Sequence, residues 1–153
     1  MSIKLAVKKT SVVLKDYVEV NGRKFFVDGK NVVLEPSNKE IGVAKWLSKR
    51  LNQTVELIPR VNLPKNIQTS DYIIEGECWD LKVVNSNLND AISSRVKNRE
   101  KQAVNFVIDV SKSKLTMKAS VNQINNLYKA RDFRWLNNII IKKNNDFQII
   151  SKK

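Results

Sequence analysis

Two short groups of residues have the types and spacing that phosphodiester chemistry requires. The first is Asp71, and the second is the triplet Asp80-Leu81-Lys82. If Glu75-Gly76 is the two-residue loop of a hairpin, Asp71 lies opposite Asp80, and Lys82 shares their face. Two facing carboxylates destabilise a sheet unless a cation offsets them, and Lys82 or a divalent metal such as Mg²⁺ can do so.

The charge of the chain indicates a polyanionic partner. Lys and Arg number 28 against 15 acidic residues, which gives a net charge of +13. Nucleic acid is the expected partner, and a membrane is not, because the sequence shows neither a transmembrane-length apolar segment nor a basic amphipathic helix. No apolar segment follows the early lysines, so we expect no signal peptide.

Two features of the composition restrict the possible chemistry. The sequence contains no histidine, which excludes histidine acid–base catalysis, Ser-His triads and histidine metal ligands. Its single cysteine, Cys78, excludes an internal disulfide and a cysteine zinc site. An enzyme built from this chain must work with carboxylates, Lys, Arg, Tyr, hydroxyls or an oxygen-ligated metal.

The sequence predicts one domain over residues 1–153, with a basic arm at 1–16, a β-meander at 17–36 and a core at 37–153. The meander is predicted from Asn21-Gly22 and Asp28-Gly29, because both positions of a type I′ hairpin turn need positive φ. The core begins with a helix of about 13 residues that opens at Ser37-Asn38-Lys39-Glu40.

The remaining core elements follow from hydrophobic periodicity and turn residues. We expect a strand at 54–58, a loop at 59–69, the Asp71 hairpin up to Val84, a helix at about 88–103, a central strand at 104–110, a helix from a capping box at Ser120-Val121-Asn122-Gln123 to about Arg131, and a closing hairpin of 135–142 with 146–150. The predicted fold class is therefore α/β (α+β), with a mixed, partly antiparallel sheet flanked by helices.

This order of elements resembles the PD-(D/E)xK nuclease core. In that core a helix glutamate, a hairpin aspartate and an acidic-x-Lys triplet bind a divalent metal and orient a water. The resemblance implies catalytic roles for Glu40, Asp71, Asp80, Lys82 and Gln102, with Mg²⁺ held by Asp71, Asp80 and Glu40.

The stretch from about Val61 to Ile150 also resembles the C-terminal tRNase domains of contact-dependent inhibition toxins, which are related to domains on phage and mobile-element proteins. The matching segments are Ser70-Asp71-Tyr72-Ile73-Ile74, Trp79-Asp80-Leu81-Lys82 and Lys101-Gln102-Ala103-Val104-Asn105-Phe106-Val107-Ile108-Asp109. The resemblance implies an endonuclease that cleaves tRNA as a toxin effector in the bacterial cytoplasm, with an acidic immunity protein as its partner.

Other interpretations stay open. Some such toxin domains are grouped with barnase/EndoU/colicin/RelE-like ribonucleases, which need no metal; Asp80 or Asp71 would then be the base, and Lys82 and Arg95 would stabilise the phosphorane. A metal-dependent DNase with the same core is a second possibility. The third is a non-catalytic protein that binds nucleic acid or has a structural role in a phage.

Several candidates have a plain structural alternative. Glu40 completes a capping box with Ser37, in which its carboxylate would bond to the helix cap. The basic residues Arg95, Arg99 and Lys101 could grip phosphates or could be a solvated helix face. Tyr72 and Trp79 could stack on unpaired bases or pack in the core.

Overall fold

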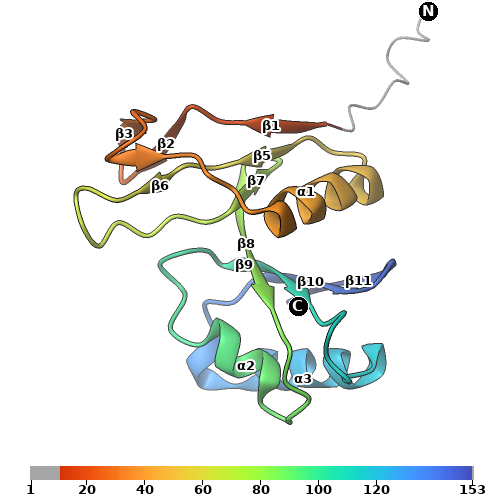
Figure 1. Ribbon diagram of the computed structural model, residues 1–153. Coiled ribbons are helices and arrows are strands. Elements are labelled where there is room, and N and C mark those ends of the chain that lie inside the picture. Colours follow the sequence, from red (N-terminus) through yellow and green to blue (C-terminus); the bar gives the residue numbers. More distant parts are fainter. Residues whose placement is uncertain (1–10, 153) are drawn as a thin grey trace, which may run out of the picture. The chain divides into compact units, whose positions relative to one another are not determined.

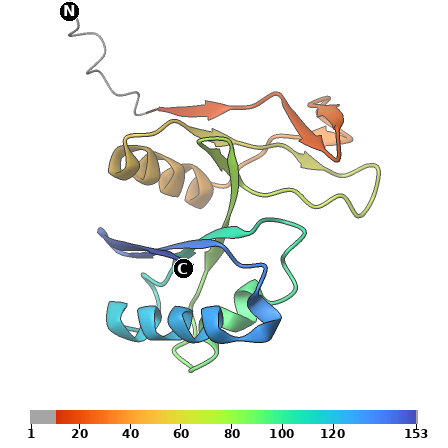
Figure 2. The same cartoon turned by 180° about the vertical axis from the view of Figure 1, so that it is seen from behind.

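The computed structural model describes residues 11–152. The chain divides into two compact units, Met1–Cys78 and Trp79–Lys153, and the boundary falls within one strand, β8 (Glu77–Val83). Figures 1 and 2 show the elements of each unit from opposite sides. In the described residues, no helix has the length and apolar character needed to cross a membrane. The predicted division into arm, meander and core uses other boundaries and stays a prediction.

The first unit contains a three-stranded sheet in the order β1-β5-β7. Strand β1 (Val12–Leu14) runs parallel to β5 (Val55–Leu57), and β5 runs antiparallel to β7 (Tyr72–Ile74). Within the predicted arm at 1–16, residues 12–14 form a strand that pairs with β5. Residues 1–10 of the arm lie outside the described residues.

Helix α1 (Asn38–Leu51) begins at the predicted capping box. The amide of Glu40 donates to the Ser37 hydroxyl over 3.1 Å, and the amide of Ser37 donates to Glu40 Oε1 over 2.7 Å. The helix ends at Asn52, which adopts a left-handed φ of 55°. Its buried side chains include Val43, Ala44 and Leu47, and the helix packs beside β1 and β5 (Figure 1). The cap therefore fixes the position of the Glu40 side chain at the start of α1.

The predicted meander is confirmed for its first two strands. Strands β2 (Tyr17–Val20) and β3 (Arg23–Phe26) pair antiparallel around Asn21-Gly22, whose φ angles of 52° and 80° fit a type I′ turn.

The third predicted strand pairs elsewhere. Strand β4 (Val32–Val33) pairs with β6 (Arg60–Val61), inside the segment predicted as a loop. The cause is Asp28, whose Oδ1 accepts hydrogen bonds from the three backbone amides of Lys30, Asn31 and Val32. This side chain replaces a hairpin turn by a capped loop, which turns the chain away from β3.

The turn before β8 is the predicted two-residue loop. Glu75 has a φ of 51° and Gly76 a φ of 80°, and these angles suit a type I′ turn between β7 and β8. Glutamate is an unusual residue at positive φ, so the sequence signal was weaker here than at Asn21-Gly22.

The second unit contains a sheet in the order β8-β9-β10-β11. Strand β9 (Asn105–Asp109) is fully buried and runs parallel to both β8 and β10 (Asn138–Lys143), and β11 (Asp146–Ser151) closes the predicted hairpin with β10. Helices α2 (Ala91–Val96) and α3 (Met117–Lys129) lie along one face of this sheet (Figures 1 and 2), and a short 3₁₀ turn, η2 (Arg131–Phe133), follows α3.

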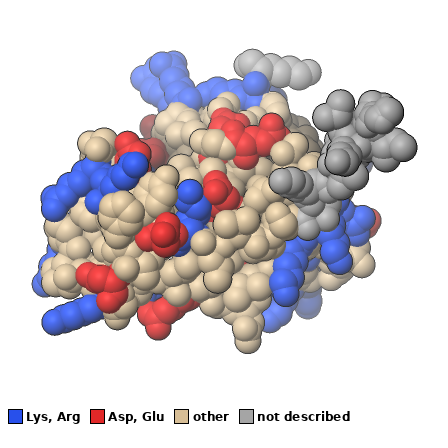
Figure 3. Space-filling view, turned by 90° about the horizontal axis from the view of Figure 1, so that it is seen from above, with Lys and Arg blue, Asp and Glu red and all other residues tan. Residues whose placement is uncertain are grey.

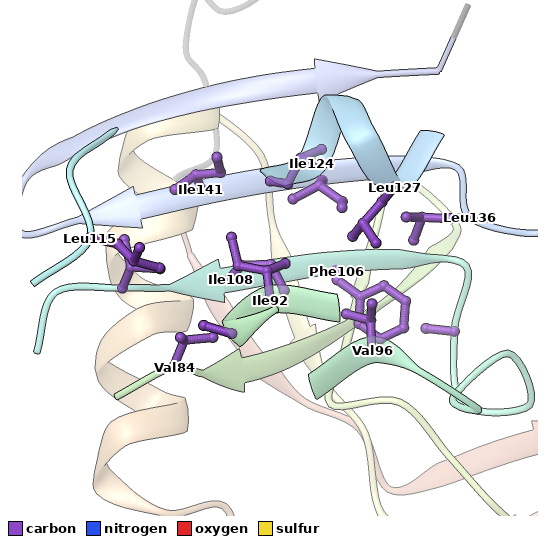
Figure 4. Packing of buried hydrophobic residues seen from close by; sticks show 14 residues of the cluster. Val84, Ile92, Val96, Phe106, Ile108, Leu115, Ile124, Leu127, Leu136 and Ile141 are labelled. Atoms are coloured by element: carbon purple, nitrogen blue, oxygen red, sulfur yellow. The ribbon is translucent and has the colours of Figure 1, made fainter. Parts of the chain in front are cut away.

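The core of the second unit lies between these helices and the sheet. Figure 4 shows the side chains that meet there: Ile92 and Val96 from α2, Ile124 and Leu127 from α3, and Phe106, Ile108 and Ile141 from the strands. All of these are at most 6% exposed. The core fixes β9, and β8 is held in register beside it.

The helix predicted at 88–103 is much shorter in the structure. Helix α2 ends at Val96, because Lys97 takes an extended ψ of 131° and Asn98 a left-handed φ of 62°. Leu88, at the start of the predicted helix, lies outside α2 and is 65% exposed. The segment that carries Arg99, Lys101 and Gln102 is therefore a series of turns and not a helix.

Helix α3 begins four residues earlier than the motif at Ser120 predicted. Thr116 is the cap, and its Oγ1 accepts a hydrogen bond from the amide of Ala119 over 3.0 Å. Ser120 lies fully buried inside the helix, where its hydroxyl donates to the carbonyl of Thr116. Four residues typical of a capping box thus occur where the chain is already helical.

Replacing Thr116 by alanine tests this cap. Thr116→Ala should lower the free energy of unfolding by about 0.5–2 kcal/mol, because the Ala119 amide loses its acceptor. Urea unfolding followed by circular dichroism measures the change. Asn122→Ala, at an exposed position within the same helix, is the matched control and should unfold like the wild type. Equal stability of Thr116→Ala and wild type would contradict the assignment of the cap.

Candidate functional site

Asp80 and Lys82 form a buried ion pair on β8. They are two residues apart on one strand, so their side chains share a face. Lys82 Nζ lies 2.7 Å from Asp80 Oδ2, and the two side chains are only 12% and 4% exposed. The contact is therefore a short, charge-assisted hydrogen bond that is largely shielded from water.

Gln102 joins this pair. Lys82 Nζ donates to Gln102 Oε1 over 3.1 Å, and the amide of Gln102 donates to the carbonyl of Arg99 over 2.9 Å, which holds the turn. The structure thus brings together three residues that the sequence singled out. An ammonium group carries three N–H donors, and these contacts use two of them, so the third is available to a ligand oxygen.

The strand register places this cluster beside a buried strand. Asp80 pairs with Phe106 and Lys82 with Ile108 on the fully buried strand β9. An apolar neighbourhood lowers the local dielectric and strengthens the ion pair, but it also makes each charge costly without its partner. Asp80, Lys82 and Gln102 are named below as the β8 cluster.

The predicted phosphate-gripping residues are exposed. Arg95 lies on α2, and Arg99 and Lys101 lie in the turns between α2 and β9. Gln102, which belongs to the β8 cluster, follows directly in the same turns. Because these three side chains are exposed, they can contact a polyanion, and both the phosphate-gripping role and the solvated face stay predictions.

Glu40 and Asp71 interact in the first unit. Burial of the Glu40 carboxyl acts to raise its pKa, but a hydrogen bond from the Asp71 side chain and those from Ser37 lower it further than burial raises it. The charge of Arg60 also lowers this pKa, and the net pKa of Glu40 lies below its ordinary value. Glu40 therefore keeps its charge at neutral pH, and its carboxylate shares a hydrogen bond with the Asp71 side chain.

Two hydrogen bonds hold the segment of Asp71 and Tyr72 in place. The Tyr72 hydroxyl donates to the carbonyl of Glu40 over 2.8 Å, which ties the first turn of α1 to β7. On the neighbouring residue, the Asp71 carbonyl accepts from the amide of Ile58 over 3.1 Å. The capping role of Glu40 is thus confirmed, and the same side chain also meets Asp71.

The two aromatic residues predicted to stack on bases are buried. Tyr72 has no exposed surface, and Trp79 is 7% exposed. A ring that presents no face to solvent cannot stack on a nucleotide. The burial of both rings therefore speaks against the predicted stacking role. Tyr72 acts instead through its hydroxyl, as an anchor for α1.

Glu40 and Asp71 could supply two carboxylate ligands to a magnesium ion, but not a full set of protein ligands. In the described residues there is no group of three or more acidic, cysteine or histidine side chains that could hold a metal. Mg²⁺ is commonly bound through one or two carboxylates, with waters and substrate phosphates as its other ligands. The neighbouring carboxyls of Glu40 and Asp71 fit that pattern, because two carboxylates can share one cation.

The sequence missed the contribution of Arg60. This exposed residue lies on β6, and its charge helps to keep Glu40 ionised. A single arginine after Pro59 gave no pattern that could have identified it. The predicted meeting of Asp71 with Asp80 joins residues of the two units, and it stays a prediction.

The lowered pKa of Glu40 predicts a pH-dependent contribution to stability. Because the pKa is lower in the folded than in the unfolded protein, the contribution is complete above 4.5 and is lost as the pH falls through the folded value. Urea unfolding from pH 7 to about pH 3 should show wild type more stable than Glu40→Gln at neutral pH, with a difference that shrinks on acidification. For Asn125→Ala, a neutral exposed change on α3, the difference from wild type should not depend on pH. A constant difference for Glu40→Gln would show that this carboxylate has no such role.

A family model described as the contact-dependent growth inhibition CdiA C-terminal domain matches residues 68–147, just over half of the chain. The matched segment includes Asp71 and the whole β8 cluster, but not Glu40. No curated protein matches the chain.

A solved structure shares the fold. It is a CdiA-CT/CdiI toxin and immunity complex from Burkholderia pseudomallei, similar with a TM-score of 0.62 at 21% identity, over 92% of this chain and 98% of that chain. The α+β architecture expected from the sequence is thus confirmed by a known toxin fold. With the family match over residues 68–147, the chain belongs to the CdiA C-terminal domain family and is a toxin effector domain of contact-dependent growth inhibition.

Proposed function

We propose that this domain is an endoribonuclease that cleaves phosphodiester bonds in tRNA. The observation that carries the proposal is the β8 cluster, in which Lys82 is held by Asp80 over 2.7 Å and by Gln102 over 3.1 Å. A buried ion pair contributes little net stability compared with apolar residues of the same size. Its occurrence beside an apolar central strand argues for a chemical role.

Lys82 is the residue that we expect to contact the scissile phosphate. Its side chain is more exposed than that of Asp80, and its ammonium has an N–H donor to spare. A fixed cation at this point would offset the charge that develops on the phosphorane. Asp80 and Gln102 act as positioning residues, because they orient the ammonium and remove its freedom to rotate.

A metal-free reaction needs a carboxylate base. The base accepts the proton of the ribose 2′-hydroxyl, whose oxygen attacks phosphorus as the bond to the 5′-oxygen breaks, and the departing 5′-oxygen takes up a proton from water. The products would be a 2′,3′-cyclic phosphate and a free 5′-hydroxyl, and the step needs no metal.

A magnesium-dependent reaction is the second candidate, and the neighbouring carboxyls of Glu40 and Asp71 support it. They would hold the ion, which would supply a positive charge when bound. The resemblance to the PD-(D/E)xK core extends this candidate to DNA as the substrate. Removal of divalent metal distinguishes the two mechanisms.

RNA binding is supported by charge, and an immunity partner by the structural neighbour. The net charge of +13 and the exposed Arg95, Arg99 and Lys101 suit a phosphate backbone. The similar structure is of a toxin with its immunity protein. We therefore propose an acidic immunity protein as the partner of this chain, since a basic toxin is best neutralised by a surface of opposite charge.

The test is cleavage of purified tRNA and plasmid DNA, with and without EDTA. Wild type should cut tRNA, and Lys82→Met should lower the rate about 10²–10³-fold, because the phosphorane loses its cation. Asp80→Asn should also lower it, since the ammonium is no longer oriented. Lys118→Ala removes an exposed lysine of α3 and should cut at the wild-type rate.

Three results would contradict this account. They are full activity of Lys82→Met, cleavage of DNA but not tRNA, and no cleavage of either substrate. Because loss of one charge of a buried pair can unfold a domain, each variant is first compared with wild type by urea unfolding. The variant Asp80→Asn/Lys82→Met removes both charges together, so that it should fold even where a single change does not.

A further inference from the structure

The outer face of the β2–β3 hairpin carries a pair of aromatic rings, of which Tyr17 is half-buried and Phe26 is exposed. Tyr17 and Phe26 are directly opposite each other in the register, and their ring centroids are 5.6 Å apart. Phe26 is 59% exposed, whereas Val18 and Phe25 on the inner face are buried. The hairpin thus buries its inner side chains and leaves the Phe26 ring accessible on the outer face.

Two lysines lie over the Tyr17 ring. The ammonium of Lys15 lies 4.5 Å from the centroid of Tyr17, and that of Lys24 lies 5.2 Å from the same centroid. Lys15 also pairs with Glu56 over 3.5 Å. Slight desolvation acts to lower the pKa of Lys15, but Glu56 and Tyr17 raise it overall, so this side chain stays charged at neutral pH.

Charge alone does not define a binding surface here. In Figure 3 the basic side chains form several small groups, with acidic groups between them. On the hairpin itself, Glu19 lies opposite Lys24 on the outer face. A polyanion would therefore find only a moderate attraction at this surface, and the exposed ring of Phe26 must supply the rest of any affinity.

We propose that Tyr17, Phe26, Lys15 and Lys24 form a docking surface for single-stranded RNA. An unpaired base stacks on Phe26, and the two lysines contact the phosphates on either side of it. Aromatic side chains interleaved with cations are the arrangement by which proteins bind unpaired nucleotides. The identity of the ligand as RNA rests on the proposed function, but binding at this surface needs no cleavage.

The surface lies outside the segment that matches the family model, which covers residues 68–147. It is also separate in sequence from the β8 cluster and from the carboxyl pair of Glu40 and Asp71. Its role is therefore to recognise the substrate and not to react with it. A tRNA offers such ligands in its loops, where bases are unpaired and can be splayed out.

The test uses a fluorescein-labelled oligouridine of about ten nucleotides with 2′-O-methyl riboses, whose binding to the full chain is followed by anisotropy. The methyl groups block the 2′-oxygen, so the affinity is measured without cleavage. Phe26→Ala should weaken binding about tenfold. Phe26→Leu should weaken it similarly, because it keeps apolar area but loses the π face, and Phe26→Trp should retain it.

Matched controls distinguish base stacking from nonspecific hydrophobic binding and from purely electrostatic binding. Leu88→Ala removes a side chain that is 65% exposed in the other unit and should leave the affinity unchanged. Lys24→Ala should reduce the salt dependence of binding by about 0.7 in the slope of log K against log salt. Binding to heparin, a polyanion without bases, should not change in Phe26→Ala.

The outcomes distinguish this proposal from the proposed function. Wild-type affinity of Phe26→Ala for the oligouridine would overturn the docking surface even if tRNA is cleaved. Equal losses with heparin, or rescue of the affinity by leucine, would also overturn it. If Phe26→Ala instead loses affinity for an immunity protein and not for RNA, the surface belongs to that protein. Weaker RNA binding in a chain that cuts no RNA would support the surface and refute only the nuclease.

Discussion

The candidate site depends on one interaction, the buried ion pair of Asp80 and Lys82. Its charges lie beside Phe106 and Ile108, where an isolated charge would be strongly unfavourable. Each side chain is therefore tolerated only because of the other. This mutual dependence holds the ammonium in one place, and Gln102 adds a second contact that sets its direction.

The same strand explains why the fold suits this arrangement. Strand β8 lies beside the buried β9, so residues two apart on it point to one face at fixed positions. Side chains of β9 pack in the core against α2 and α3, and this packing holds the strand in place. A rigid strand holds a catalytic cation more accurately than a loop could, because its backbone is fixed by neighbours along its whole length.

Much of the fold could be predicted from local sequence signals. The turns at Asn21-Gly22 and Glu75-Gly76, the cap at Ser37 and the apolar run of β9 were all recognisable, because each depends on neighbouring residues. The errors occurred where the structure depends on contacts between residues distant in sequence, or on side-chain hydrogen bonds that compete with regular secondary structure. Examples are the pairing of β4 with β6, which Asp28 directs, and the early end of α2.

The site was predictable in its residue types but less in its roles. The spacing of Asp80 and Lys82 was sufficient to place them together, since strand geometry has a period of two. The contact of Lys82 with Gln102 was not predicted, because a turn of irregular backbone carries Gln102 and the family resemblance implied only a catalytic role for this residue. Burial was not predictable: alternation along β7 and β8 did not reveal that Tyr72 and Trp79 are covered.

The most direct measurement is a double-mutant cycle on tRNA cleavage with Asp80→Asn, Lys82→Met and the double variant. If Asp80 acts by orienting Lys82, its substitution should matter little once Lys82 is gone, and the double variant should be about as slow as Lys82→Met alone. Losses that multiply would contradict the account, because they would mean that the two side chains act independently. Unchanged cleavage in all three variants would mean that the ion pair has no part in the reaction.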